Sequence, residues 1–500
     1  MLSKLTKIFE KFSKRNALFI KGKYYTYQEL SEKITTIIQV LKNSTAKKSK
    51  LIGIICSDEF ETYASFFAAW FSGYGFVPIN PRNPFDRNNN ILEQTDIEII
   101  LSAEKDILNI VDTKNLIIIY TKEIPGSSNF LNIPEIQDNQ VMCILFTSGS
   151  TGIPKGVPMT LKNINATIDA FQALGYKLTA EDRFLQMFEF TFDMSILSYL
   201  PAMMLGACVY SVSDAKVKYL AAVKIMQEHD ITFAAMVPST LAFLKPYFKE
   251  LKLEKLRYSL LGGEPFYKDI AAEWAKCIPN ALIVNISGPT ETTMACMGYT
   301  LHRNMQENKT YNGILAFGRP WKNTKAIVID EKKKPVATGV QGELCFAGDN
   351  VMEGYWNMPE KNKEVFFNLK FEGKNIRFYK TGDMTFVDND GDFMTCGRID
   401  HQVKIQGHKV ELGEIEVLVR ESIPDANIVV LAGINDKGIK ELFLFIDKPK
   451  LDHTAIIEYL KTKVPWFMIP KEVISIEVFP TNANGKIDRL ALLSLIPKNE

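Results

Sequence analysis

A stretch rich in glycine, hydroxyl side chains and lysine could hold a chain of phosphates. It runs from Phe146 to Val157 (FTSGSTGIPKGV) and follows the apolar run 141–145. Glycine permits positive φ and a close approach of backbone N–H groups to an anion, and lysine adds charge. We therefore expect a buried strand that opens into an oligophosphate-binding loop. The candidate phosphate ligands are Thr147, Ser148, Gly149, Ser150, Thr151, Gly152 and Lys155.

This loop is not a Walker A motif. A G-x-x-x-x-G-K-[ST] pattern that begins at Gly149 would need glycine at Pro154 and Ser or Thr at Gly156. Stretches rich in glycine and serine are also common in mobile surface loops, so the loop alone leaves that alternative open.

The elements around the loop indicate an α/β fold. Short apolar runs at 51–55, 76–79 and 97–101 alternate with helical patterns at 59–72 and from 85 onward. The alternation resumes with apolar runs at 232–236, 258–261 and 281–286 and helical patterns at 239–247 and 266–277. Such alternation is typical of a mainly parallel sheet covered by helices, whose ligands bind at the carboxyl ends of the strands. The polar segments 262–265 and 287–292 follow two such ends.

The rest of the chain predicts two further parts. Alternating patterns and turn residues from Lys325 onward indicate a β-rich subdomain, and a small α+β domain follows a boundary near Asp400. We expect a large N-terminal domain over 1–399 and a small C-terminal domain over 400–500, which we also expect to be mobile.

Composition narrows the class of partner. The 500 residues are 46% hydrophobic and 23% charged, with a net charge of +1, so neither nucleic acid nor another anionic polymer is expected to be held by bulk charge. The seven cysteines are scattered and predict reduced thiols in a cytoplasmic protein. A basic pattern over residues 2–12 could form a membrane-surface helix, but a first helix of the domain is the favoured interpretation. No signal peptide and no membrane span are expected.

Eight motifs in a fixed order resemble the adenylate-forming superfamily of acyl-CoA synthetases, peptide-synthetase adenylation domains and luciferases. The likeness covers almost the whole chain and is closest to amino-acid adenylation domains and to stand-alone D-alanine:carrier-protein ligases. It implies that a carboxylate and Mg-ATP give an acyl-adenylate and pyrophosphate, after which a thiol takes the acyl group. The motifs are the loop 146–157, 192–195, 263–264, 288–291, 342–344, 379–383, 397–407 and 484–489.

The resemblance implies a role for several nucleotide-site residues. Lys486 would bridge the substrate carboxylate and the α-phosphate, Glu291 would bind Mg²⁺, and Asp383 would bind the ribose. The alternatives are an exposed lysine, a first-turn acid at a helix start and a turn former, respectively. The further ATP-binding positions by likeness are Gly263, Glu264, Ser287, Gly288, Thr290 and Arg398. Arg398 could instead be a surface charge.

Asp193 is the residue that points to an amino acid. In amino-acid adenylation domains the matching aspartate pairs with the substrate's α-ammonium group, and a buried unpaired charge is costly enough to select for an amine. The alternative is a helix N-cap. By likeness, the substrate pocket is apolar and comprises Asp193, Met194, Leu197, Leu260, Gly262, Ile286, Met294 and Ala295. A small or medium apolar amino acid fits this lining.

Three positions depart from the family pattern. Ser287 stands where a tyrosine usually stacks on adenine, Gly262 stands where D-alanine ligases carry cysteine, and Asn482 replaces a threonine. Asp400 matches the hinge about which the small domain rotates, which would withdraw Lys486 and bring the segment around Gly407 to the site. A simple interdomain linker is the alternative for Asp400.

The expected function is therefore ATP-dependent activation of an amino acid and its transfer to the phosphopantetheine thiol of a carrier protein. Since no carrier module is recognisable before Glu500, the carrier is expected in trans. Two alternatives stay open: an acyl- or aryl-acid:CoA ligase, and a non-catalytic nucleotide sensor of the same fold, suggested by Ser287.

Overall fold

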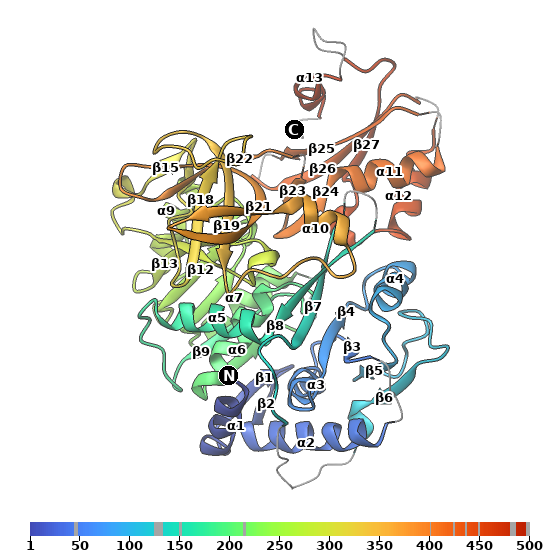
Figure 1. Cartoon of the computed structure of the whole chain (residues 1–500), viewed down its shortest axis with the longest axis vertical. Helices are drawn as coiled ribbons and strands as arrows, with labels where there is room; N and C mark the ends of the chain where they lie inside the picture. Colours follow the sequence, from blue (N-terminus) through green and yellow to red (C-terminus); the bar gives the residue numbers. More distant parts are fainter. Residues whose placement is uncertain are drawn as a thin grey trace.

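Two large sheets with helices on their faces form the N-terminal part of the chain, and a β-rich part and a small α+β part follow (Figure 1). The computed structural model describes residues 1–44, 49–124, 134–149, 153–213, 217–400, 402–423, 426–435, 438–448, 451–480 and 487–496.

The larger sheet has nine strands in the order β17-β14-β13-β12-β11-β9-β10-β1-β2. Strands β1, β10, β9, β11, β12 and β13 run parallel, whereas β2, β14 and β17 at the two edges pair antiparallel. The bounds are β1 (Asn16–Ile20), β2 (Lys23–Thr26), β9 (Arg183–Gln186), β10 (Cys208–Ser211), β11 (Phe233–Met236), β12 (Tyr258–Gly262), β13 (Leu282–Ser287), β14 (Met297–Thr300) and β17 (Arg319–Pro320). Strands β1 and β2 form a hairpin around Gly22.

The second sheet has six strands in the order β6-β5-β3-β4-β7-β8. All its pairs are parallel except β7–β8, which closes one edge antiparallel. The bounds are β3 (Leu51–Ile55), β4 (Gly75–Ile79), β5 (Ile99–Ser102), β6 (Ile117–Tyr120), β7 (Val141–Thr147) and β8 (Lys155–Thr160). The phosphate loop therefore joins two paired strands, and Thr147 and Lys155 belong to the strands themselves.

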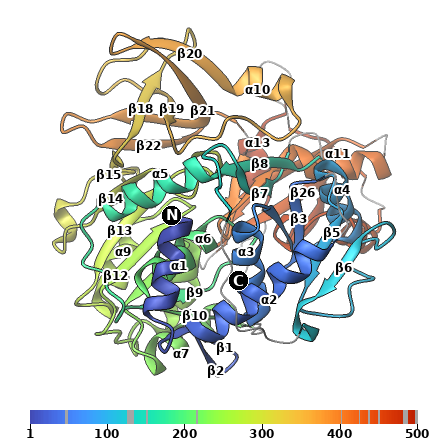
Figure 2. The same ribbon diagram turned by 60° about the horizontal axis from the view of Figure 1, so that its bottom comes forward.

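Helices pack the two sheets into one apolar core. Tyr63 and Phe66 of α3 contact Tyr199 of α6, so α3 lies against α6 on one side and against β3 and β4 on the other (Figure 2). Leu2, Leu5 and Phe9 of α1 are buried in the same core, as expected of a first domain helix. The bounds are α1 (Leu2–Lys11), α2 (Tyr27–Asn43), α3 (Phe60–Phe71), α4 (Phe85–Thr95), α5 (Leu161–Gln172), α6 (Met194–Leu205), α7 (Lys218–Glu228), α8 (Pro238–Leu244) and α9 (Lys268–Cys277).

The β-rich part contains a sheet in the order β18-β19-β21-β20, with β22 also paired to β21. Its elements are β18 (Thr324–Ile329), β19 (Gly342–Gly348), α10 (Pro359–Val365), β20 (Phe366–Phe371), β21 (Lys374–Val387) and β22 (Phe393–Arg398), beside the small pair β15 (Thr310–Tyr311) and β16 (Ile314–Leu315). Short 3₁₀ turns cover η1 (Thr121–Glu123), η2 (Lys245–Tyr247), η3 (Thr290–Thr292), η4 (Met305–Glu307) and η5 (Trp466–Met468).

The last hundred residues have an apolar core of their own. The hairpin β23 (Gln402–Ile405) and β24 (His408–Glu411) leads into α11 (Leu412–Ser422), and the sheet β25-β26-β27 carries α12 on one side. The remaining bounds are β25 (Ile428–Ile434), β26 (Lys440–Ile446), α12 (His453–Lys461), β27 (Glu472–Ser475) and α13 (Arg489–Leu493). The domain boundary at 399/400 stays a prediction.

The seven cysteines are all free thiols, six of them buried. In the described part of the chain, no helix is both long and apolar enough to cross a bilayer.

Candidate active site

The phosphate loop meets the C-terminal part of the chain. Ser148 is only 3% exposed, and its hydroxyl donates to the carbonyl of Lys409 at 2.6 Å. The Gly149 N–H donates to Glu414 Oε2 at 3.1 Å, and Glu414 also pairs with Arg87 at 3.0 Å. Ser150, Thr151 and Gly152 lie outside the described residues. The described ends of the loop therefore lie against the β23–β24 hairpin and the start of α11.

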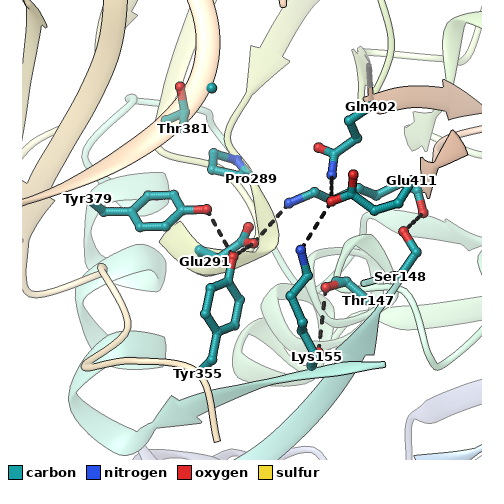
Figure 3. A network of polar contacts seen from close by, with 12 residues as sticks. Thr147, Ser148, Lys155, Pro289, Glu291, Tyr355, Tyr379, Thr381, Gln402 and Glu411 are labelled. Carbon is teal, nitrogen blue, oxygen red and sulfur yellow. Dashed lines mark hydrogen bonds and ion pairs between the residues drawn. The ribbon is translucent and has the colours of Figure 1, made fainter. Parts of the chain in front are cut away.

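Lys155 is buried at the start of β8. Its ammonium lies 3.1 Å from Glu411 Oε1, an oxygen that also accepts a hydrogen bond of 2.6 Å from the Gln402 amide (Figure 3). Burial and the positive charge of Lys409 lower the pKa of Lys155, and Glu411 and Glu291 act in the opposite direction. The loop thus contains one buried cation that requires a negative partner.

Glu291 lies at the centre of the network in Figure 3 and is fully buried. Burial alone would raise its pKa, but Lys409 Nζ at 3.0 Å and the Tyr355 hydroxyl at 2.6 Å from Oε1 outweigh this and hold the pKa at about 2. Its setting is a three-residue 3₁₀ turn, η3, and not the helix start that the sequence suggested. First-turn helix electrostatics therefore do not explain Glu291.

Glu291 fits the role of a magnesium ligand. Its Oε2 atom is buried without a hydrogen-bond partner among the described residues, so one carboxylate oxygen is available. Magnesium commonly takes one or two carboxylates together with phosphate oxygens and water. No group of three or more candidate metal ligands occurs in the described part of the chain, so Mg²⁺ would need the phosphates to complete its coordination.

Asp383 and Arg398 lie together on neighbouring strands. Arg398 donates to Asp383 Oδ1 at 2.7 Å and to both oxygens of Asp400 at 2.7 and 2.8 Å. Burial acts to lower the pKa of Arg398, but hydrogen bonds and the charges of these two carboxylates raise it overall. Both residues line the cavity that contains Ser287, so Arg398 is not an isolated surface charge. Both carboxylate oxygens of Asp400, the expected hinge residue, are thus bound by Arg398.

Asp193 precedes α6 without capping it. Its backbone is already helical, and its side chain makes no capping hydrogen bond, so the N-cap alternative is wrong. The carboxylate lines the cavity, and burial raises its pKa to about 7 against a hydrogen bond from Thr290 and the charge of Lys404. Among the described residues, no ion pair reaches this carboxylate.

The cavity continues from the phosphate loop to Asp193 and the strand ends. Of the expected substrate-site residues, Met194, Ile286, Met294 and Ala295 line it with Asp193, and so do the nucleotide-site candidates Thr147, Ser148, Gly263, Ser287, Gly288, Thr290, Asp383 and Arg398. Leu197 and Leu260 are buried behind this lining. Gly262 is covered by Ile286, since a Cβ at Gly262 would lie 2.6 Å from the Ile286 carbonyl oxygen and 2.7 Å from its side chain.

Glu264 joins the hairpin to the larger sheet. Its Oε1 accepts the Gly407 N–H at 2.8 Å, and its Oε2 accepts the Ser239 N–H at 2.9 Å. Gly407 has a φ of +85°, and a Cβ there would lie 2.6 Å from Val237. Only glycine fits this backbone, which places the segment around Gly407 in the wall of the cavity.

Lys486 lies outside the described residues. Arg489, three positions later, donates to the carbonyl of Val430 in β25 and pairs with Glu416 of α11 at 3.4 Å.

The sequence did not point to the basic side chains and the aromatic side chain that complete the cavity. Lys404, His408 and Lys409 line it, and Phe317 lines the adjoining region around Ser287. A signal for the first three was present, because they flank Gly407 in the pattern K-x-x-G-H-K. Nothing marked Phe317 in the sequence.

Comparisons with known proteins identify the family and the fold. Residues 5–356 match the AMP-binding enzyme family. The chain is 31% identical over 95% of its length to a linear gramicidin synthase of Brevibacillus parabrevis, but spans only 6% of that protein. Solved structures with the same fold include the peptide-synthetase protein PA1221, which contains adenylation and carrier (PCP) domains (TM-score 0.87, 22% identity, 100% of this chain and 84% of that one). Another is o-succinylbenzoate CoA synthetase of Bacillus subtilis (TM-score 0.83, 21% identity, 98% of both chains). The chain belongs to the AMP-binding enzyme family, within the adenylate-forming superfamily.

Proposed function

We propose that the chain activates a small or medium apolar amino acid with ATP and transfers the aminoacyl group to the phosphopantetheine thiol of a carrier protein presented in trans. The observation that carries this proposal is the buried carboxylate of Asp193, which has no ion-pair partner among the described residues. An α-ammonium group supplies the positive partner that this carboxylate lacks, whereas a plain acyl group leaves it buried without one.

The apolar lining supports a limited side-chain size. Met194, Ile286, Met294 and Ala295 surround the end of the cavity near Asp193, and Ile286 covers Gly262. Methionine side chains adapt to different apolar shapes, so neighbouring small and medium side chains should be accepted with graded efficiency.

The nucleotide roles rest on the resemblance to the adenylate-forming superfamily, and the position of Asp383 in the same cavity supports them. We assign the β- and γ-phosphates to the loop 147–155, the ribose to Asp383, and the bridge between the carboxylate and the α-phosphate to Lys486. Bound Mg²⁺ would be held by Glu291 and phosphate oxygens, where it neutralises phosphate charge.

Pyrophosphate exchange with a panel of amino acids and their deaminated counterparts tests the proposal. We expect exchange with one or a few apolar amino acids and little with the matched deaminated acids. Exchange with deaminated acids alone would establish an acyl- or aryl-acid ligase instead. ATP binding without exchange for any acid would indicate a nucleotide sensor. Adding holo carrier protein or CoA to the reaction then identifies the acceptor by mass spectrometry of the thioester.

A further inference from the structure

His408 lies where two cavities meet. It is the first residue of β24 and lines the cavity that contains Asp193 and the phosphate loop. It also lines a neighbouring cavity whose walls include Lys218, Phe243 and Trp466. Phe192, whose ring centroid is 5.6 Å from that of His408, is likewise shared by both cavities. His408 and Phe192 therefore form the boundary between the reaction site and a second space.

Aromatic packing fixes the imidazole of His408. Its ring is stacked on Phe467 at 4.0 Å with an interplanar angle of 3°, and Trp466 lies edge-on at 5.8 Å. Among the described residues, no hydrogen bond or ion pair occupies either ring nitrogen of His408, whereas Nε2 of His453 lies 2.7 Å from the Ser475 hydroxyl. Stacking thus positions the imidazole ring, and its two nitrogens are available to a bound substrate.

The charges around His408 favour the neutral ring. Burial lowers its pKa, Lys218 lowers it further, and Glu189 raises it less than burial lowers it. Arg82 lines the same second cavity and adds positive charge, and Arg82 lies 3.9 Å from Glu189. A neutral imidazole can accept a proton at neutral pH.

We propose that His408 is the general base that removes the thiol proton in the acyl-transfer step. The proposal rests on the function proposed above. The thiol sulfur attacks the acyl carbonyl carbon, the S–C bond forms, and the bond from that carbon to the phosphate oxygen of AMP breaks. AMP leaves with that electron pair, and the S–H proton moves to a ring nitrogen of His408. No oxidation or reduction occurs.

The second cavity provides the approach for the thiol. Its rim includes Trp466, which is 44% exposed, and its inner end is the His408–Phe192 boundary. The glycine at position 407 keeps the backbone beside this boundary free of a side chain. A thiol at the end of a slender arm that enters here reaches His408 before it reaches the acyl group beside Asp193.

Lys404 and Lys409 are the two lysines that also line the reaction cavity. Lys409 is paired with Glu291 at 3.0 Å. Burial lowers the pKa of Lys404, although the charges of Asp383 and Asp193 act in the opposite direction. Neither lysine lines the second cavity, whereas His408 does.

Transfer rates of His408 variants test the proposal. The donor is the acid that exchanges pyrophosphate fastest in the wild type, and the acceptor is pantetheine at saturating concentration. His408→Phe keeps a ring to stack on Phe467 but has no base. We expect single-turnover thioester formation to fall about 10²-fold, a typical contribution of general base catalysis, and to fall at least tenfold more than pyrophosphate exchange does. In the wild type the transfer rate should decrease as acidic pH protonates His408, and this limb should vanish in the variant.

Two further variants separate chemistry from folding. His408→Ala should be rescued severalfold by added imidazole, and His453→Gln should transfer at the wild-type rate. A His408→Phe enzyme that transfers as fast as the wild type, or that loses exchange and transfer equally, would overturn the proposal. Absence of exchange with every acid in the wild type would refute the proposed function itself, and with it this role.

Discussion

Replacing Asp193 by asparagine should change how activity depends on pH. In the free enzyme the carboxylate has a pKa of about 7 because it is buried. The pH dependence of kcat/KM reports ionisations of the free enzyme. An amino-acid substrate needs the ionised carboxylate, so its kcat/KM should fall about tenfold per pH unit below 7. Asp193→Asn should remove this limb.

The structure also sets the size of the effect. Loss of one partner of a buried ion pair costs about 3–5 kcal/mol, so Asp193→Asn should lower kcat/KM for the amino acid at pH 8 by at least about 10²-fold. The kcat/KM of the wild type for the matched deaminated acid should depend on pH differently. This acid binds beside a neutral side chain, so its kcat/KM in the wild type should not fall as the pH decreases to 5.5.

Unfolding measurements give an independent reading of the same carboxyl group. The folded pKa lies above the ordinary value of 3.8, so the folded state binds the proton more tightly than the unfolded state does. Stability from this group is therefore complete below pH 3.8 and is lost as the pH rises through 7, by about 4 kcal/mol. Above pH 7, Asp193→Asn should unfold at higher denaturant concentration than the wild type.

Pyrophosphate exchange between pH 5.5 and 8.5 and urea unfolding at pH 5 and 8 measure these effects. Asp230→Asn, which alters a largely exposed aspartate, serves as the control and should match the wild type. An acid limb that persists unchanged in Asp193→Asn would refute the assignment, and so would equal pH profiles for the amino acid and its deaminated counterpart.

Four other substitutions test separate parts of the site. Gly407→Ala should slow thioester formation more than adenylation, because its Cβ would lie 2.6 Å from Val237 at a φ of +85°; equal rates in stopped-flow transfer assays would contradict this. Ser287→Tyr should tighten ATP binding by about 1–3 kcal/mol in calorimetry through base stacking, unless Phe317 already supplies that contact, in which case Phe317→Ala should weaken binding by a similar amount. Lys486→Ala should abolish pyrophosphate exchange while leaving transfer from supplied aminoacyl-adenylate largely intact, and equal loss of both would argue against separate roles for the two steps.

The strand and helix pattern was largely predictable, because buried parallel strands leave continuous apolar runs. The β7 strand and the helices α3 and α9 lie within a few residues of where the sequence places them. The antiparallel partner β8 was not expected, since it begins at Lys155 inside a stretch whose glycines and proline suggest a loop.

The contacts within the site were much less predictable. Asp193 is a residue type that often caps helices but lacks the geometry of an N-cap, and Glu291 lies within a 3₁₀ turn and not at the start of an α-helix. The pairs Lys409–Glu291 and Lys155–Glu411 join residues more than a hundred positions apart, and no local pattern specifies such partners. Leu197 and Leu260 are apolar like the true lining, so only the packed structure shows that they lie one layer behind it.

The β23–β24 hairpin and α11 provide side chains that pair with buried charged and polar groups of the N-terminal part. Lys409 neutralises Glu291, Glu411 neutralises Lys155, and Glu414 accepts the Gly149 N–H. A buried charge without a partner would cost several kcal/mol, so the core can be free of nucleotide without leaving these groups bare. To bind here, Mg²⁺ would have to replace Lys409 beside Glu291, and phosphate would have to replace Glu411 beside Lys155. The net charge of the site then changes little on binding, so the binding equilibrium should depend only weakly on ionic strength.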